Sequence, residues 1–274
     1  MTPAPHQTST STSTSTSTVT VTSSPALPAL LAVLLLTACP SPRVHPRAAE
    51  EVSKGYRYLS TGDLERADVA FAHALEFNED IPEAQNGAGV VARKRGDLAA
   101  ARRRFEHAVK VAPDFAEGHV NLGELELAGE RWTAAEEEFR AALRIDPDLV
   151  VARLDLARSL LHRGRREPDR RDALFAAARR EYLHLLESDP ALSEAHHDLG
   201  FMDYVSGSYE RSAAEYGRAA ELAPDYTEAL HGRCIALARL GRSEEAARAC
   251  RRCLEVNAGA DRCTQSLRGI TAGK

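Results

Sequence analysis

The chain has 274 residues and a formal net charge of −5, with 43% hydrophobic but only 5% aromatic residues. Ala, Leu, Arg and Glu dominate, and they favour helix because they lose little side-chain freedom there. The lack of a basic excess argues against a nucleic-acid partner. Since the sequence also lacks a phosphate-binding glycine loop and a nucleophile elbow, we expect no catalysis, no cofactor, no metal and no small-molecule substrate.

The first 47 residues have the pattern of an export signal. Residues 8–18 alternate Thr and Ser, a composition that cannot bury enough apolar surface to offset the entropy of ordering. Residues 26–36 then form an apolar run. A membrane-spanning helix needs about 20 residues, so this run is too short to span but is typical of a signal peptide.

The sequence Leu36-Thr37-Ala38-Cys39 follows the apolar run and resembles the lipobox of bacterial lipoproteins. The resemblance implies that residues 1–38 are removed and that Cys39 receives diacylglycerol and becomes the mature N-terminus. Residues 39–47 would then be a tether, and the protein would be anchored to a membrane without crossing it. No Lys or Arg precedes Arg43, which indicates an unusual leader or a later translation start. An ordinary secretory signal with an incidental Cys39 is the alternative.

From Ala48 onward the sequence repeats itself every 34 residues, as the steps from Phe71 to Phe105 and from Phe105 to Phe139 show. Each copy carries two apolar stripes at helical spacing, separated by a Gly near its midpoint. Small residues at positions 8, 20 and 27 of most copies let two helices approach, and an aromatic residue at position 24 of most copies fills the gap between them. A Pro at position 32 of most copies ends the second helix.

This pattern resembles the tetratricopeptide repeat. The resemblance implies an all-α, right-handed solenoid of six helix-turn-helix repeats, because no copy can bury its stripes without a neighbour. Residues 261–274 would form a capping helix and tail. The six copies span residues 48–81, 82–115, 116–149, 150–192, 193–226 and 227–260.

The fourth copy, residues 150–192, is nine residues longer than the others, and the extra residues fall within 165–176. Insertions in a solenoid lie in loops between helices, often at a functional edge. A solvated extension is the alternative that we favour, because the Arg residues of this segment alternate with Glu167, Asp169 and Asp172.

Cys234, Cys250, Cys253 and Cys263 cluster at the C-terminal end of the repeats. An even set of Cys in an exported protein indicates disulfides, while zinc binding and buried free thiols are the alternatives. If disulfides form, antiparallel helix geometry favours the pairs Cys234–Cys250 and Cys253–Cys263. Such bonds would stabilise the last repeat, which lacks one neighbour.

In this fold the first helix of each repeat lines the inner face, mainly through positions 2, 5, 9 and 12. An apolar track with interspersed polar groups is suited to a segment of another protein. Packing of some of these side chains against neighbouring first helices is the alternative. The track comprises Val52, Tyr56, Asn86, Val90, Val120, Glu124, Leu154, Phe201 and Ile235, with Arg158, His197 and His231 beside them.

The sequence His196-His197-Asp198 resembles part of a metal or phosphohydrolase site. Adjacent residues on a helix point about 100° apart, so these three side chains are not expected to converge on one ion. We therefore place His196 in the seam between helices, and His197 and Asp198 on the inner face.

A lipobox followed by six such repeats is similar to the type IV pilus pilotins. The resemblance implies a location on the periplasmic face of the outer membrane and a role in assembling a secretin into its ring. The partner would be a secretin subunit. A lipoprotein that serves another envelope assembly, such as polysaccharide export or a tethered enzyme complex, remains the alternative.

The lipobox gives the first test. Mass spectrometry of the mature protein should show an acylated N-terminal Cys39, because the box lies where the apolar run ends. A soluble product that carries an unmodified Cys39, or that is cleaved elsewhere, would contradict the prediction.

Overall fold

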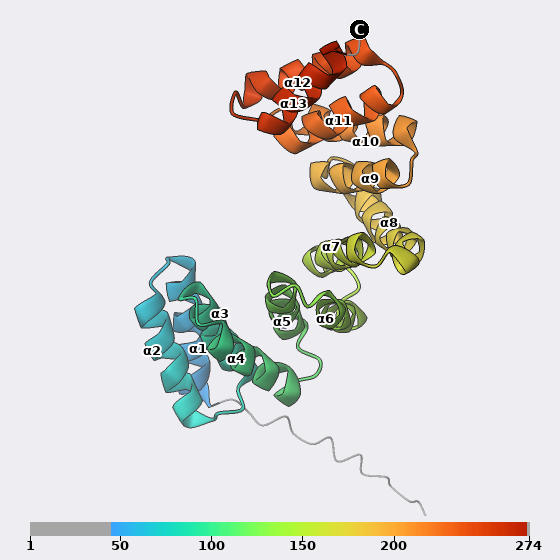
Figure 1. Ribbon diagram of the computed structural model, residues 1–274. Helices are drawn as coiled ribbons and strands as arrows, with labels where there is room; N and C mark the ends of the chain where they lie inside the picture. Colours follow the sequence, from blue (N-terminus) through green and yellow to red (C-terminus); the bar gives the residue numbers. More distant parts are fainter. Residues whose placement is uncertain (1–44, 273–274) are drawn as a thin grey trace, which may run out of the picture. The chain divides into compact units, whose positions relative to one another are not determined.

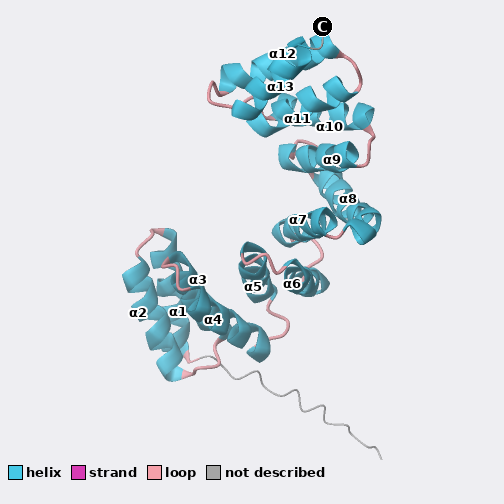
Figure 2. Ribbon diagram, viewed as in Figure 1, coloured by secondary structure: helices cyan, strands magenta, loops and turns pink. Residues whose placement is uncertain are grey.

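The structure, a computed structural model, describes residues 45–272, and within them the chain forms thirteen α-helices and no strand (Figures 1 and 2). The expected signal peptide and Cys39 lie outside the described residues. Twelve helices form six consecutive pairs, and the thirteenth follows the last pair, which confirms the predicted fold. The pairs are α1 Pro46–Ser60 and α2 Leu64–Phe77, α3 Pro82–Lys94 and α4 Leu98–Val111, α5 Ala116–Ala128 and α6 Trp132–Ile145, α7 Val150–Arg166 and α8 Arg171–Ser188, α9 Ser193–Val205 and α10 Tyr209–Leu222, and α11 Thr227–Arg239 and α12 Ser243–Val256, followed by α13 Asp261–Ala272.

Short turns separate the two helices of a pair, and their sequences explain why one helix ends and the next begins. Gly62 and Gly96 adopt φ values of 78° and 84°, a left-handed conformation that Gly enters without a Cβ clash. The Asp that follows each Gly caps the second helix: Asp63 accepts a hydrogen bond from the Arg66 amide, and Asp97 accepts one from the Ala100 amide.

Each helix pair packs on the next pair along the chain. The second helix of every repeat contacts the first helix of the following repeat, and the first helices of adjacent repeats also meet at α1–α3, α3–α5, α5–α7 and α9–α11. Helix α13 packs on both α11 and α12. These contacts between consecutive repeats form a solenoid, because each repeat buries its apolar surface against the next one.

The aromatic residue at position 24 is the largest buried group of most repeats. Phe71, Phe105 and Phe139 are 0% exposed. A Cβ added to Gly55 would lie 2.5 Å from the Phe71 ring, and one added to Gly87 of the next repeat would lie 2.2 Å from it. Since real Cβ atoms do not approach so closely, the Phe71 ring requires both glycines and is wedged between two repeats, while Phe105 and Phe139 lie similarly close to Gly89 and Gly123 of their own repeats.

The last repeat replaces this glycine–aromatic contact with a disulfide. Cys234 takes the position of the glycine and Cys250 that of the ring, and their Sγ atoms are bonded at 2.08 Å with Cα atoms 5.4 Å apart. A second disulfide joins Cys253 of α12 to Cys263 of α13, with Cα atoms 6.4 Å apart. These are the two pairs that the helix geometry favours. All four side chains are buried, so they also supply core volume.

The insertion of the fourth repeat is largely solvated, as expected, but it also buries two side chains. It lengthens both helices, α7 to 17 residues and α8 to 18, and a 3₁₀ turn at Pro168–Arg170 joins them. Leu174 and Phe175 are only 6% and 4% exposed. A further turn on each helix keeps the apolar stripes facing each other, and Gly164 leaves room for the Phe175 ring, which would lie 2.5 Å from an added Cβ. The added segment therefore extends the core as well as the surface.

None of the helices in residues 45–272 is both long and apolar enough to span a membrane.

The two disulfides predict a local effect of reduction. Non-reducing peptide mapping should find no free thiol among Cys234, Cys250, Cys253 and Cys263. Reduction should lower the free energy of unfolding by about 2–4 kcal/mol per bond. Because contacts join only neighbouring repeats, hydrogen exchange should increase in α11–α13 and change little in α1–α6. Ready alkylation of all four thiols in the native, unreduced protein would show that the bonds do not exist.

Candidate peptide-binding groove

The side chains expected to line the inner face are far more enclosed than a free groove requires. Asn86 is 0% and Val120 is 9% exposed, and both belong to the interior. The other seven residues of the predicted apolar track are half-buried. Val52 and Tyr56 pack against the core of the first two repeats, where the Tyr56 ring meets the Phe71 ring edge-on at 5.2 Å. Val90 packs on the core around Phe105, and Val120 and Leu154 belong to the core of the middle repeats.

Asn86 joins three consecutive first helices instead of facing a partner. Its Nδ2 donates to Tyr56 Oη at 3.2 Å and to Glu117 Oε1 at 3.0 Å. Its Oδ1 accepts from Asn121 Nδ2 at 2.9 Å. Burial is the main cause that raises the pKa of Tyr56 to about 12 and raises that of Glu117. The expectation that Asn86 contacts a partner is wrong, because a buried amide bonded on both sides offers no free surface.

The remaining polar residue of the first half also connects repeats. Glu124 of α5 forms an ion pair with Arg93 of α3. Together with the hydrogen bonds of Asn86, this pair occupies the polar groups that α3 and α5 present on the inner face. The first half of the predicted groove therefore serves inter-repeat packing to a large extent.

The second half of the inner face is hollowed. Phe201 of α9 and Ile235 of α11 line a cavity of about 700 Å³, together with His197 and His231. Helix α13 and the turn before it close the far side, and His231 Nε2 lies 3.1 Å from Ser266 Oγ of α13. The cavity is further lined by Arg165, Tyr216, Thr227, Glu228, Gly232, Asn257, Gly259, Ala260, Asp261, Arg262 and Cys263.

His196 and His197 lie on different faces of α9, as expected from helix geometry. His196 lies in the seam, where Nδ1 is 2.7 Å from Glu215 Oε2 and Nε2 is 3.2 Å from the Pro190 carbonyl oxygen. His197 stacks on Tyr226 with ring centroids 5.0 Å apart and lies 2.9 Å from Asp198. Within residues 45–272, no three His, Cys, Asp or Glu side chains gather as metal ligands would.

A second cavity, of about 530 Å³, lies where the third and fourth repeats meet. We call it the insertion pocket, because the extra turn of α7 supplies Arg165 and Arg166 to its wall. Trp132, the single Trp of the chain, stacks on His162 with ring centroids 6.1 Å apart, and Arg166 lies 5.3 Å from the centre of the Trp132 ring. The insertion pocket is lined by Leu127, Ala128, Glu130, Trp132, His162, Arg165 and Arg166.

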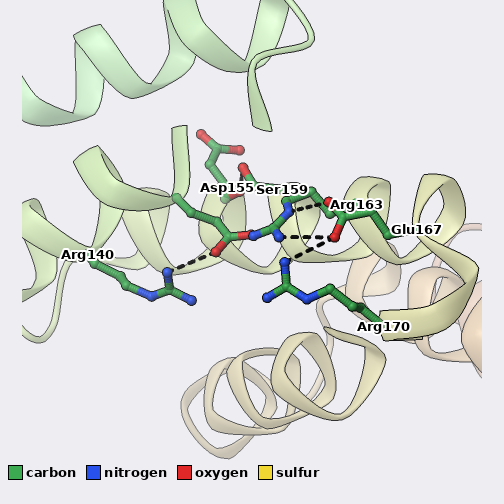
Figure 3. A network of polar contacts seen from close by, with 7 residues as sticks. Arg140, Asp155, Ser159, Arg163, Glu167 and Arg170 are labelled. Atoms are coloured by element: carbon green, nitrogen blue, oxygen red, sulfur yellow. Dashed lines mark hydrogen bonds and ion pairs between the residues drawn. The ribbon is translucent and has the colours of Figure 1, made fainter. Parts of the chain in front are cut away.

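A buried ion pair anchors the inserted turn (Figure 3). Arg163 Nη1 donates to Glu136 Oε1 of α6 at 2.7 Å, and the two residues are only 6% and 3% exposed. Arg163 Nε also donates to Glu167 Oε1 at 2.9 Å, while Arg140 donates to Glu136 at 2.8 Å. Because these groups satisfy one another, the turn that carries Arg165 is held in place from both sides.

Comparison with known proteins agrees with this architecture. Residues 86–150 and 203–261 match the tetratricopeptide repeat family. The fold is a tetratricopeptide-repeat solenoid. No curated protein matches the sequence. Among solved structures, Pseudomonas aeruginosa PilF is 16% identical with a TM-score of 0.65, and the match covers 83% of this chain and 98% of PilF.

Two further solved structures have the same fold. PilW, whose structure is described as that of a widely conserved type IV pilus biogenesis factor, is 17% identical with a TM-score of 0.64, and 83% of this chain and 99% of PilW are covered. YrrB, described as having an unusual peptide-binding site, is 16% identical with a TM-score of 0.60, and 72% of this chain and 97% of YrrB are covered. At these identities the likeness concerns the fold.

The tetratricopeptide turn of the third repeat contains a strained residue that the sequence analysis missed. Glu130 has a φ of 55°, whereas the same position holds a Gly of positive φ in four other repeats. A non-glycine residue in this conformation destabilises the folded state by about 1–2 kcal/mol. The exposed ion pair between Glu130 and Arg166 offsets little of this free energy. Glu130 lines the insertion pocket. The sequence signal for this conformation is the absence of Gly from a position that holds Gly in the other repeats.

This conformation can be tested with two variants that both lack the carboxylate. Glu130→Gly should be about 1 kcal/mol more stable than Glu130→Ala, because only Gly enters the left-handed region without a clash. Chemical denaturation of the two proteins measures the difference. If position 130 had an ordinary φ, the order would reverse, since Gly raises the entropy of the unfolded chain.

Proposed function

We propose that the protein is a lipid-anchored tetratricopeptide scaffold that binds a secretin subunit and promotes its assembly in the outer membrane during type IV pilus biogenesis. The fold is that of a scaffold with an extended binding surface. The observation that carries the finer proposal is the likeness to PilF and PilW, which extends over nearly their whole length. The expected lipidation at Cys39 would hold the repeats next to the membrane in which the partner assembles.

The cavity of the last two repeats is the part of the inner face best suited to this task. Phe201 and Ile235 offer apolar surface, and the rings of His197 and His231 lie beside them. A partner side chain buried here would contribute about 1.5–3 kcal/mol. The polar groups around the cavity would orient the bound segment, as in other peptide-binding grooves.

The proposal predicts that a charge placed in this cavity blocks assembly. Ile235→Asp should abolish secretin multimers on denaturing gels of envelope fractions, because a carboxylate would be buried against an apolar partner. Leu183→Asp is the matched control, since Leu183 is 49% exposed on α8 and lines neither cavity. Circular dichroism and immunoblotting should show both variants folded and at normal abundance.

Unchanged multimers in a folded Ile235→Asp protein would remove this cavity from the assembly role. Unchanged multimers in a strain that lacks the whole protein would contradict the secretin role itself. In that case, proteins that co-purify from detergent-solubilised envelopes would identify a different assembly, such as polysaccharide export or a tethered enzyme complex.

A further inference from the structure

Arg165 lines both the insertion pocket and the cavity of the last two repeats. It lies at the end of α7, in the turn that the fourth repeat has gained. One side chain therefore separates two hollows, and each hollow contains aromatic rings: Trp132 and His162 on one side, Phe201 and His197 on the other.

The charge of Arg165 is uncompensated. Its neighbours Arg163, Arg166 and Arg170 all form ion pairs with glutamates, whereas Arg165 forms none among residues 45–272. Glu130, the acidic residue of the insertion pocket, is already paired with Arg166. In the other cavity, the carboxylates of Glu228 on α11 and Asp261 on α13 line the wall, and neither forms an ion pair with Arg165. The unmatched cation is thus at the junction of the two hollows.

Arg165 is also positioned before any partner binds. Its guanidinium carbon lies 5.0 Å from the centre of the Phe201 ring, a cation–π contact that restricts the side chain. The buried Arg163–Glu136 pair fixes the backbone two residues earlier. A group held in this way loses less conformational entropy when it binds a ligand.

The pKa values of two histidines that line these hollows are lowered, mainly by burial. Burial, and then the charge of Arg165, lowers the pKa of His162. Burial, and then the charge of Arg262, lowers the pKa of His231. Both rings are therefore neutral and able to stack near neutral pH, while the arginines keep their charge.

We infer that the two hollows form one recognition site for an extended protein segment in which a carboxylate lies between aromatic or aliphatic side chains, and that Arg165 binds that carboxylate. This inference rests on the proposed protein-binding role and names the chemistry of the partner. The planar guanidinium presents two parallel N–H donors to a carboxylate, and the flanking rings bury the neighbouring side chains of the segment. The inserted turn is then what gives this solenoid its specificity.

Two synthetic peptides of about twelve residues, which reach roughly 40 Å when extended, can test the inference. One alternates Phe, Ser and Glu, and the other has Gln at every Glu position. Anisotropy of a labelled peptide measures affinity. The fluorescence of Trp132, the single Trp of the chain, reports directly on the insertion pocket, because neither peptide contains Trp.

The Glu peptide should bind at least about tenfold more tightly than the Gln peptide, and it should shift the Trp132 emission. Arg165→Gln should remove this preference and leave binding of the Gln peptide unchanged. Arg165→Glu should instead favour a peptide with Lys at those positions. Arg180→Gln is the matched control, because Arg180 is exposed in the same repeat and lines neither cavity.

Equal binding of the Glu and Gln peptides, a preference that survives in Arg165→Gln, or no binding of the Glu peptide would each overturn the inference. Its failure is distinguishable from that of the secretin proposal. If secretin multimers persist without the protein while the Glu preference depends on Arg165, the recognition site stands and only the identity of the partner changes. If multimers require the protein but the preference is absent, the assembly role stands without this site.

Discussion

The contact between a small residue of the first helix and a large ring of the second controls the rest of this structure. Phe71 shows why, since its ring fills the space left by Gly55 in its own repeat and by Gly87 in the next. One side chain thus closes a helix pair and joins it to its neighbour. The stability of the solenoid is consequently a sum of local terms, and the terminal repeat, which has no following glycine to pack against, uses the Cys234–Cys250 bond at the same two positions.

Polar contacts between the first helices decide how much of the inner face is free in the first half of the solenoid. In the first three repeats the first helices meet directly, and Asn86 and Glu124 form bonds between them that leave little free surface. Farther along, α7 is longer by a turn and α13 is held by the Cys253–Cys263 bond. These two elements act as walls, and the hollow that contains Phe201 and Ile235 lies between the helices that they flank. The hollow of the second half thus lies between the two departures from the regular repeat.

Two arginines of the inserted turn differ in burial and therefore in the contacts that they make. Arg163 is buried and paired with Glu136, and the cost of desolvating the two charges cancels much of their attraction. Arg165, two residues later, is exposed, lies over the Phe201 ring and forms no ion pair within the described part of the chain. The first fixes the turn, and the second is then available to a partner at a defined place.

The sequence by itself determined the six helix pairs and the capping helix, because periodicity, small residues and turn glycines are local signals repeated along the chain. For the four cysteines it only favoured the two pairs that the structure contains. It did not determine that Asn86 is buried, that Phe175 belongs to the core, or that Arg165 lies between two hollows. Position 5 of a repeat faces inward in every copy, but its exposure depends on how closely the next first helix approaches. That distance follows from the packing of whole repeats, and a nine-residue insertion changes it in a way that only the tertiary structure reveals.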